Sequence, residues 1–395
     1  MDAFYASVEL LRYPDLRGSA VVIGGGRDAS PQLNTDGTRR YAKLRYYAGR
    51  GVITTCTYEA RALGAHSGMG VMKAAVLAPD AVLLPVDFDE YRKYSRLFKA
   101  AARGVAPVLE DRGIDEIYLD ITELPGAQID AGRAVGEALR QAVFDATGLT
   151  CSVGITPNKL LSKICSDLNK PNGLTLLNAS EISGRIWPLP AKKINGIGPK
   201  ATEKLAGFNI HTIGDLAAAE PQFLLGHFGK SYGAWLHEAA NGRDDRPVVT
   251  FSEPKSISRE TTFDRDLHAV RDRSTLTPIF TDLCVKLAGD LTRKGYASKT
   301  IGIKLRFDDF KIVTRDLTLP VHTMDAQDIR RAAGACLKRV DLSRRLRLLG
   351  VRAGALVKLA DVPGVVAQAE PKELELSLFE GLASSSDIPT RPRSG

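Results

Sequence analysis

The sequence predicts a multidomain protein of mixed class, in which an α/β region is followed by a helical region and then by an α+β domain. Short apolar runs alternate with amphipathic helical patterns as far as about residue 185. Pro188 and Pro190 then open a stretch with helical periodicity. After residue 254, the order strand, helix, strand, strand, helix, strand predicts a compact βαββαβ unit. A chain of 395 residues can form two to four packed cores.

In the α/β region, strands are predicted where short apolar or β-branched runs lie between turn residues or charges. They are residues 20–24, 51–56, 108–110, 114–121 and 149–156, of which 108–110 and 114–121 pair as a hairpin. Helical spacing of apolar residues predicts two helices, 88–105 and 131–147. Residues 27–50 form a polar loop in which cations alternate with tyrosines. That pattern suits either a flexible nucleic-acid contact or a plain solvated loop.

In the helical region, residues 194–200 open a helix, and residues 241–247 have the charge and proline content of a linker. After an initial strand, the α+β domain continues with helix 276–294, strands 300–307 and 312–319, helix 328–340 and strand 346–356. From about residue 361 the chain is polar, and we expect it to be disordered except where it meets a partner.

The composition predicts a cytoplasmic protein without a membrane segment. No run approaches the ~18 uninterrupted apolar residues that a membrane helix needs. Asp2 and Glu9 stand where a signal peptide would be basic and then apolar. The five cysteines have no paired spacing, so neither a disulfide framework nor a zinc site is predicted.

The positive charge is concentrated in one region. Residues 255–358 hold 22 basic and 12 acidic residues, whereas residues 359–395 hold 3 basic and 6 acidic ones, and the whole chain has a net charge of +8. A region with a concentrated surplus of positive charge is expected in a protein that binds a polyphosphate backbone. On charge alone, a solvated basic surface explains the surplus equally well.

Asp115 and Glu116 are adjacent carboxylates between the apolar residues Ile114 and Ile117. At the end of a strand, two such carboxylates can converge on Mg²⁺, because buried charges in a sheet need a cation. An isolated acidic pair is more often the water-facing rim of a hairpin, and the pair by itself does not decide between these readings.

The segment Gly196-Ile197-Gly198 is a more specific signal. Two glycines allow backbone amides to approach a phosphate at the start of a helix, which predicts a helix-hairpin-helix that grips DNA without reading its sequence. Lys192, Lys193 and Lys200 around it favour this reading over an ordinary turn between helices.

Over nearly its whole length, the chain resembles the Y-family lesion-bypass DNA polymerases of the bacterial polymerase IV type. Five motifs in the family's order carry the resemblance: residues 1–9, 58–61, 114–120, 153–159 running to 170–173, and the glycine hairpin. The resemblance implies a right-hand polymerase with palm, fingers, thumb and a C-terminal βαββαβ little finger. The implied parts are palm 1–19 and 81–185, fingers 20–80, helical thumb 186–240, linker 241–254, little finger 255–358 and tail 359–395.

The implied activity is template-directed, error-prone DNA synthesis across damaged template, by nucleotidyl transfer with two Mg²⁺ ions and without proofreading. The implied partners are primer–template DNA and deoxynucleoside triphosphates, and the protein would act as a monomer. Asp115 would bridge both metals, and Glu116 would bind the one that activates the primer 3′-hydroxyl. The Met1 carbonyl would be a backbone ligand, and Tyr5 would be the steric gate against a 2′-hydroxyl.

The resemblance also implies residues that bind nucleotide and DNA. Those for the incoming nucleotide are Phe4 through its backbone amide, Thr55 beside its neighbour Thr54, Tyr58, Arg61 and Lys170. Those for DNA are Gly196, Gly198, Lys200, Ser258 and Arg259.

One departure from the family concerns the first motif, which reads Asp-x-Asp after an apolar strand. This chain starts at the x, as Met1, and Asp2 matches the second aspartate, which is not the usual ligand. We expect a translation start upstream of Met1. A catalytically impaired DNA-binding scaffold in a mutagenesis complex would also explain the difference. A nucleotide cyclase with a similar palm would need neither the glycine hairpin nor the basic domain.

Near the C-terminus, residues 375–379 resemble the sliding-clamp-binding peptide, with Leu376, Leu378 and Phe379 entering an apolar pocket. The family's leading Gln is Glu375 here. A sliding clamp is therefore an expected partner, and a short amphipathic tail is the alternative.

Overall fold

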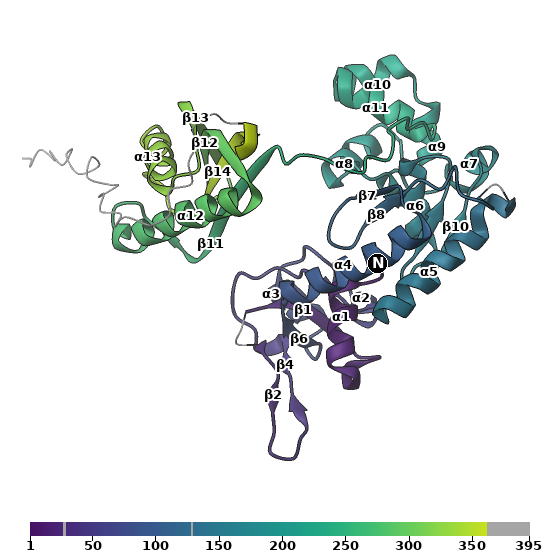
Figure 1. Ribbon diagram of the computed structural model, residues 1–395, viewed down its shortest axis with the longest axis horizontal. Helices are drawn as coiled ribbons and strands as arrows, with labels where there is room; N and C mark the ends of the chain where they lie inside the picture. Colours follow the sequence, from purple (N-terminus) through teal and green to yellow (C-terminus); the bar gives the residue numbers. More distant parts are fainter. Residues whose placement is uncertain (27–28, 128, 362–395) are drawn as a thin grey trace, which may run out of the picture. The chain divides into compact units, whose positions relative to one another are not determined.

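The computed structural model describes residues 1–26, 29–127 and 129–361. The chain divides into two compact units, the first spanning Met1–Ser252 and the second starting at Glu253 (Figure 1). Within the described ranges, no helix is both long and apolar enough to cross a membrane.

Four short strands form a mixed sheet near the start of the first unit. They are β1 (Val21–Gly25), β4 (Ala42–Lys43), β5 (Thr55–Cys56) and β6 (Val82–Pro85), in the order β4, β6, β1, β5. Both faces of β1 are covered. Val22 packs in the cluster that includes α2 (Tyr58–Ala62) and α3 (Val71–Leu77), whereas Ile23 packs with α1 (Phe4–Arg12). Successive residues of a strand point to opposite faces, so this sheet holds α1 in a fixed position.

Two further pairs of strands lie in the same unit. β7 (Leu109–Asp111) pairs antiparallel with β8 (Ile117–Leu119), and β9 (Val153–Ile155) pairs parallel with β10 (Leu174–Leu176). Helices α4 (Phe88–Val105) and α5 (Arg133–Thr147) pack against each other, and α6 (Lys159–Leu168) packs on β9. The predicted hairpin and helix 88–105 are confirmed. β8 starts at Ile117, later than predicted, so the acidic pair precedes the strand.

The predicted helical stretch is also confirmed. It contains α8 (Pro199–Ala206), α9 (Ile213–Ala218), α10 (Pro221–Phe228) and α11 (Lys230–Ala240), and α7 (Ile182–Arg185) lies just before it. Leu205, Leu216 and Leu236 from three of these helices are completely buried in one cluster. The Thr212 hydroxyl and the Asp215 carboxylate cap the start of α9 reciprocally.

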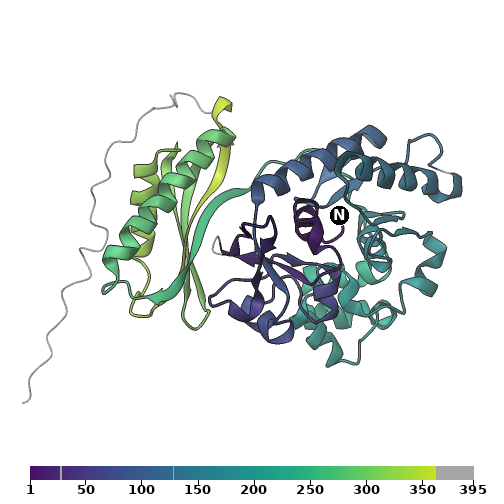
Figure 2. The same ribbon diagram turned by 90° about the horizontal axis from the view of Figure 1, so that it is seen from below.

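The second unit is the predicted α+β domain. Its elements are β11 (Ser256–Leu267), α12 (Arg273–Lys294), β12 (Tyr296–Phe307), β13 (Ile312–Thr323), α13 (Ala326–Leu337) and β14 (Leu346–Lys358). The strands form one antiparallel sheet in the order β11, β14, β12, β13. Both helices lie along one face of this sheet (Figure 2). Ile301, Ile303 and Leu305 point to that face and are buried against the helices, whereas the alternate residues of β12 face away.

Two predictions of irregular structure were wrong in part. Residues 27–50 contain the hairpin of β2 (Gln32–Leu33) and β3 (Arg39–Arg40), which projects from the first unit (Figure 1). Hydrogen bonds between Asn34 and Thr38 close its turn. The predicted linker has no helix or strand from 241 to 252, but hydrogen bonds fix it to the first unit. The side chain of Asp244 accepts one from the Leu160 amide at 3.0 Å. The polar composition of these segments could not predict the hydrogen bonds between Asn34 and Thr38 or between Asp244 and Leu160.

The remaining elements are short 3₁₀ turns: η1 (Pro14–Leu16), η3 (Leu44–Tyr46), η4 (Ile129–Gly132), η5 (Ala179–Glu181), η6 (Ala191–Lys193) and η7 (Leu359–Asp361). The predicted clamp-binding residues Leu376, Leu378 and Phe379 lie outside the described residues.

Candidate active site

A pocket beside the start of α1 brings together segments that are far apart in the sequence. Seven of the residues predicted for the site line it: Met1, Phe4, Tyr5, Thr55, Arg61, Asp115 and Lys170. The other lining residues are Ala3, Thr54, Ser67 and Ile114. The pocket therefore combines an aromatic ring, a carboxylate and two cations in one place.

A buried carboxylate, Asp2, holds three of these segments together. It accepts hydrogen bonds from the Ser152 hydroxyl at 2.7 Å and from the Asn172 amide at 2.8 Å, and its own amide donates to the Thr150 carbonyl. Both oxygens of its side chain accept these hydrogen bonds, and only 2% of the residue is exposed. Asp2 therefore has a structural role, which agrees with its not being assigned as a metal ligand.

The Met1 amine donates a 2.9 Å hydrogen bond to the backbone carbonyl of Asp115. The contact fixes the loop before β8 against the start of the chain, so the Asp115 side chain faces the pocket that α1 borders.

The two acidic residues are placed differently. Asp115 is half-buried, and no ion pair joins it to any other side chain in the part of the chain that the structure describes. Glu116 is exposed and forms an ion pair with Lys163 of α6. Both line a second, largely apolar pocket between β8 and β9; of the two carboxylates Asp115 alone lines both pockets, as do Met1 and Lys170.

The oxygen donors at this point fit Mg²⁺, which is usually held by one or two carboxylates together with substrate phosphates and water. Asp115 lines both pockets and Glu116 lines the second one, and Met1, whose carbonyl is the predicted backbone ligand, is a lining residue of both. Over residues 1–26, 29–127 and 129–361, no three His, Cys, Asp or Glu side chains come together as a metal site. Asp115 and Glu116 would hold the ion, together with phosphate oxygens of the substrate.

Tyr58 lies beside Arg61, which lines the pocket, but Tyr58 itself is not among the lining residues. The Tyr58 hydroxyl is buried and has no hydrogen-bond partner among the described residues. Arg61 lies over the Tyr58 ring at 4.9 Å and donates through Nε to the Cys56 carbonyl at 3.3 Å. Burial raises the pKa of Tyr58 to about 12, so at neutral pH the hydroxyl remains a donor. An unpartnered buried donor beside a guanidinium suits an anionic ligand.

Lys170 lies on the same pocket and pairs with Asp167 at 2.9 Å. Ser67 also lines it but was missed from the sequence. A single serine in a glycine-containing turn carries no signal of its own, because only the fold brings it to Arg61 and Lys170.

Comparison with known proteins assigns the chain that forms this pocket to a family. Residues 1–167 match the impB/mucB/samB family, and residues 254–368 match the C-terminal domain of that family. The chain is 38% identical over 356 residues to DNA polymerase IV of Methanoculleus marisnigri, which covers 90% of this chain and 92% of the relative. It is 36% identical over 359 residues to DNA polymerase IV of Alkalilimnicola ehrlichii, covering 90% and 94%.

The chain belongs to this family of Y-family DNA polymerases. Solved structures agree. A Y-family polymerase chimera of Dbh and Dpo4 has a TM-score of 0.75 and 25% identity, covering 90% of this chain and 97% of that one. DinB from Sulfolobus solfataricus has a TM-score of 0.59 at 24% identity, covering 89% and 96%, and supports the fold alone. The protein is a translesion DNA polymerase of the polymerase IV type.

The glycine hairpin of this polymerase lies in the helical part of the first unit. Gly196 has a φ of 115°, and a Cβ there would lie 2.6 Å from the Trp235 ring. At Gly198 a Cβ would meet nothing within 4 Å, and φ is −83°. Packing therefore explains the glycine at position 196 but not the one at 198. The lack of a side chain at Gly198 leaves the backbone at the start of α8 open to a phosphate.

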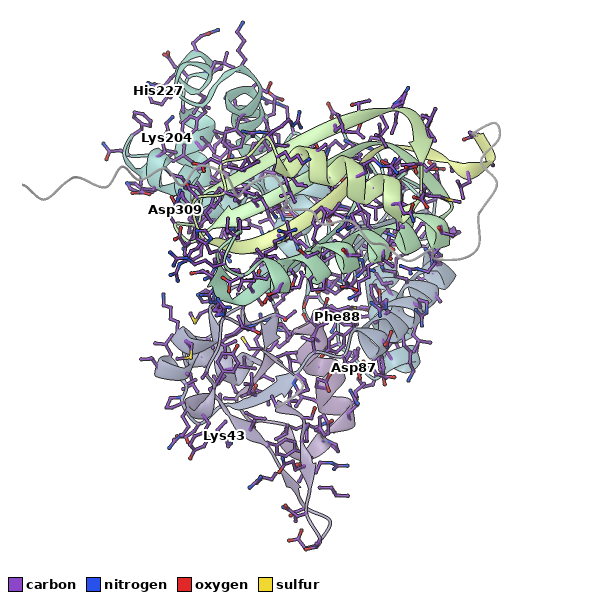
Figure 3. All side chains as sticks on the ribbon, turned by 90° about the vertical axis from the view of Figure 1, so that its left-hand side faces the viewer. Lys43, Asp87, Phe88, Lys204, His227 and Asp309 are labelled. Atoms are coloured by element: carbon purple, nitrogen blue, oxygen red, sulfur yellow. The ribbon has the colours of Figure 1, made fainter. Side chains whose placement is uncertain are left out.

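Lys200 lies in the first turn of α8 and is exposed, as binding to a backbone phosphate requires. Another cation of this helix, Lys204, is held against α10 through a hydrogen bond to the His227 carbonyl, and Figure 3 shows the two residues near each other. Lys200 is therefore placed to bind a phosphate, whereas Lys204 is held by its hydrogen bond within the helical region.

Ser258 and Arg259, both predicted to contact DNA, point to opposite faces of the sheet in the second unit. Arg259 forms a two-pronged ion pair with Asp290 of α12, on the face covered by helices. Ser258 lies opposite Arg352, which in turn lies opposite Gly302, so this row is on the face away from the helices. In the structure, the Arg259 guanidinium is thus engaged within the domain.

Proposed function

We propose that the polymerase adds deoxynucleotides to a primer at the pocket beside α1, with Asp115 and Glu116 holding two Mg²⁺ ions. The observation that carries this proposal is the meeting of Tyr5, Arg61, Asp115 and Lys170 from four separate segments in one pocket. When bound, the ions would neutralise phosphate charge and lower the pKa of the primer 3′-hydroxyl.

On the phosphate side, Arg61 presents a planar fork that matches two phosphate oxygens, and Lys170 adds a point charge. The Tyr58 hydroxyl gains a partner when an oxygen of the triphosphate arrives, which relieves the cost of a buried unpartnered donor. The amide of Phe4 at the first turn of α1 is a further donor, because the first amides of a helix have no partner within it.

On the sugar side, Tyr5 places a half-buried ring in the pocket wall, and Thr55 provides a small side chain beside it. A ring close under the sugar leaves no room for a 2′-hydroxyl, the group that distinguishes a ribonucleotide. The small threonines permit base pairs of altered shape.

The DNA would be held mainly through its backbone. The open backbone at Gly198, the exposed Lys200, and Ser258 with Arg352 on the helix-free face of the second unit all suit phosphate oxygens. The proposed parts are those expected from the sequence, with the little finger corresponding to the second unit. Binding of a sliding clamp through Leu376, Leu378 and Phe379 is a proposal that rests on the sequence.

One observation favours a second candidate function. Glu116 is held by Lys163 in an ion pair, which fits a protein that binds DNA as a scaffold without extending a primer.

Primer extension with Mg²⁺ on Asp115→Ala distinguishes the two functions. We expect the variant to lose at least about 1,000-fold in kcat/KM, because it removes the carboxylate on which both pockets converge. DNA affinity and thermal stability should remain near those of the parent. Extension that survives in Asp115→Ala would contradict the metal assignment. DNA binding without any extension by the parent would favour the scaffold.

A further inference from the structure

The ring of Tyr5 rests on a second aromatic ring, that of Tyr91 in α4. The two rings are stacked, with centroids 4.1 Å apart and planes 12° from parallel. Phe88 meets the edges of both rings, at 6.1 Å from Tyr5 and 6.0 Å from Tyr91. Tyr91 is completely buried, whereas Tyr5 is half-exposed at the pocket. Tyr91 is therefore the floor that supports the ring facing the nucleotide.

A buried carboxylate fixes the plane of the Tyr91 ring. The Tyr91 hydroxyl donates a 2.7 Å hydrogen bond to Glu9, of which only 2% is exposed. Glu9 lies four residues after Tyr5 in α1, so both side chains are on the same face of that helix. One hydrogen bond thus joins the helix that carries the gate to the helix that carries its support.

An ion pair nearby joins the same two helices. Arg12 of α1 pairs with Asp87 at 2.8 Å and with Glu9 at 3.4 Å. Asp87 also caps α4 by accepting a hydrogen bond from the Glu90 amide. Figure 3 shows Asp87 and Phe88 together at the start of α4. The start of α4, and with it Tyr91, is therefore fixed relative to α1 by two separate polar contacts.

These polar groups lie in an apolar cluster, where they are costly. Burial raises the pKa of Glu9 and that of Tyr91. A phenylalanine at position 91 would fill almost the same space without a buried hydroxyl and carboxylate. What the hydrogen bond adds is direction, because the ring torsion of an aromatic side chain is otherwise broad.

We propose that Tyr91, oriented by Glu9, is a positioning residue for sugar selection: it sets the height and tilt of the Tyr5 ring against the nucleotide sugar. The inference rests on the proposed function, in which Tyr5 faces that sugar. A steric gate discriminates by distances of an ångström or less, so the support of the ring controls selectivity as the ring itself does.

The test is single-nucleotide insertion of matched deoxy- and ribonucleoside triphosphates, with selectivity taken as the ratio of their kcat/KM values. Tyr91→Leu removes the floor, and we expect the ratio to fall about 10-fold while insertion of the deoxynucleotide falls about 3-fold or less. Tyr91→Phe removes only the hydrogen bond, and Glu9→Leu removes it together with the ion pair to Arg12; each should lower the ratio about 3-fold. Glu9→Gln keeps an acceptor for the hydroxyl and should retain most of the selectivity.

Two controls make the outcome specific. Tyr94 lies on the same helix and packs on the same cluster without a ring contact to Tyr5, so Tyr94→Leu should leave the ratio unchanged. Tyr5→Ala should abolish most of the selectivity. If Tyr91→Leu does not fold, Tyr91→Phe retains the ring and carries the test.

The results separate failure of the inference from failure of the proposed function. Loss of selectivity in Tyr5→Ala with an unchanged ratio in Tyr91→Leu, Tyr91→Phe and Glu9→Leu overturns the inference alone. Equal losses for both nucleotides in the Tyr91 variants mean that Tyr91 supports only the fold, and this also overturns it. An unchanged ratio in Tyr5→Ala would contradict the role of Tyr5 as the steric gate, and with it the inference about Tyr91.

Discussion

The two units of this polymerase use charge in different ways. In the first unit, individual charges have fixed partners: Glu110 is buried between Lys159 at 2.7 Å and the Val249 amide at 2.9 Å. In the second unit, a surplus of ten positive charges is spread over residues 255–358. Ion pairs on its helix-free face, such as Lys304 with Glu260, are exposed in part.

In the first unit, the effect of a charge depends on its buried position and its partner. On the helix-free face of the second unit, it depends mainly on the total charge. A buried charge that loses its partner is costly, whereas an exposed pair contributes little. Substitution of a buried, paired charge of the first unit should therefore have a large effect, and substitution of an exposed charge on the helix-free face of the second unit a small, salt-dependent one.

The largest effect is expected on stability, from Glu110→Gln. It leaves Lys159 buried beside a neutral side chain, and the free energy of unfolding should fall by about 3–5 kcal/mol. Chemical denaturation measures this, and the double variant Glu110→Gln/Lys159→Met should recover a large part of the loss. Losses that simply add in the double variant would show that the two residues act separately.

The same pair gives a pH dependence. Burial by itself would raise the pKa of Glu110, but the hydrogen bonds from Lys159 and Val249 outweigh it and lower the pKa below 4.5. A lowered pKa means that the pair stabilises fully above about pH 4.5 and less as the pH falls through the folded-state pKa. The stability difference between the parent and Glu110→Gln should therefore shrink in acid. A difference that grows in acid would reverse the assignment.

The next effect is on nucleotide binding. Arg61→Ala should raise KM for the incoming nucleotide about 30- to 100-fold, because charge-assisted bonds to the triphosphate are lost. Arg61→Lys should be intermediate, since an ammonium cannot make the forked contact. Steady-state insertion kinetics measure both. An unchanged KM in Arg61→Ala would place the triphosphate elsewhere.

A smaller effect on the same step is expected from Tyr58→Phe. The variant deletes a hydroxyl that has no partner within the described protein, so stability should be equal or slightly higher, while KM rises about 10-fold or less. Thermal unfolding and insertion kinetics on the same sample separate the two effects. Lower stability together with an unchanged KM would assign the hydroxyl to the fold.

The smallest effect is expected in the second unit. Arg352→Ala should weaken DNA binding about 2- to 3-fold and reduce the slope of log affinity against log salt by about one. Lys338→Ala removes the same charge at the end of α13, on the helix side of the sheet, and is the matched control. Fluorescence anisotropy over a salt series distinguishes them. Equal changes in both variants would mean that only net charge counts.

The elements that sequence periodicity predicted best are those whose pattern is long. Helix α4 was predicted over residues 88–105 and has these bounds, and the strands of the second unit have 12 or 13 residues each. Among the described residues of the first unit, no strand exceeds five residues. A strand as short as β4 repeats too little to be recognised, β5 occupies only the last two residues of the predicted strand 51–56, and the hairpin of β2 and β3 was read as loop.

For the candidate site, the sequence by itself determined which residue types were available. The acidic pair, the Tyr58–Arg61 motif and the glycine hairpin were all recognised from local order along the chain. Their roles were not determined locally, since an isolated pair such as Asp115 and Glu116 is more often a hairpin rim, and Tyr5 was assigned to the sugar only through the family resemblance.

Only the tertiary structure decided which of these residues meet. It brings Asp115, Arg61 and Lys170 to one pocket. It turns Asp2 into a buried tie to residues 150 and more positions away. It also places Tyr91 under Tyr5, with Glu9 holding its hydroxyl. The physical reason is that helix and strand patterns depend on neighbours in sequence, whereas burial and hydrogen-bond partners depend on segments that become neighbours only when the chain folds.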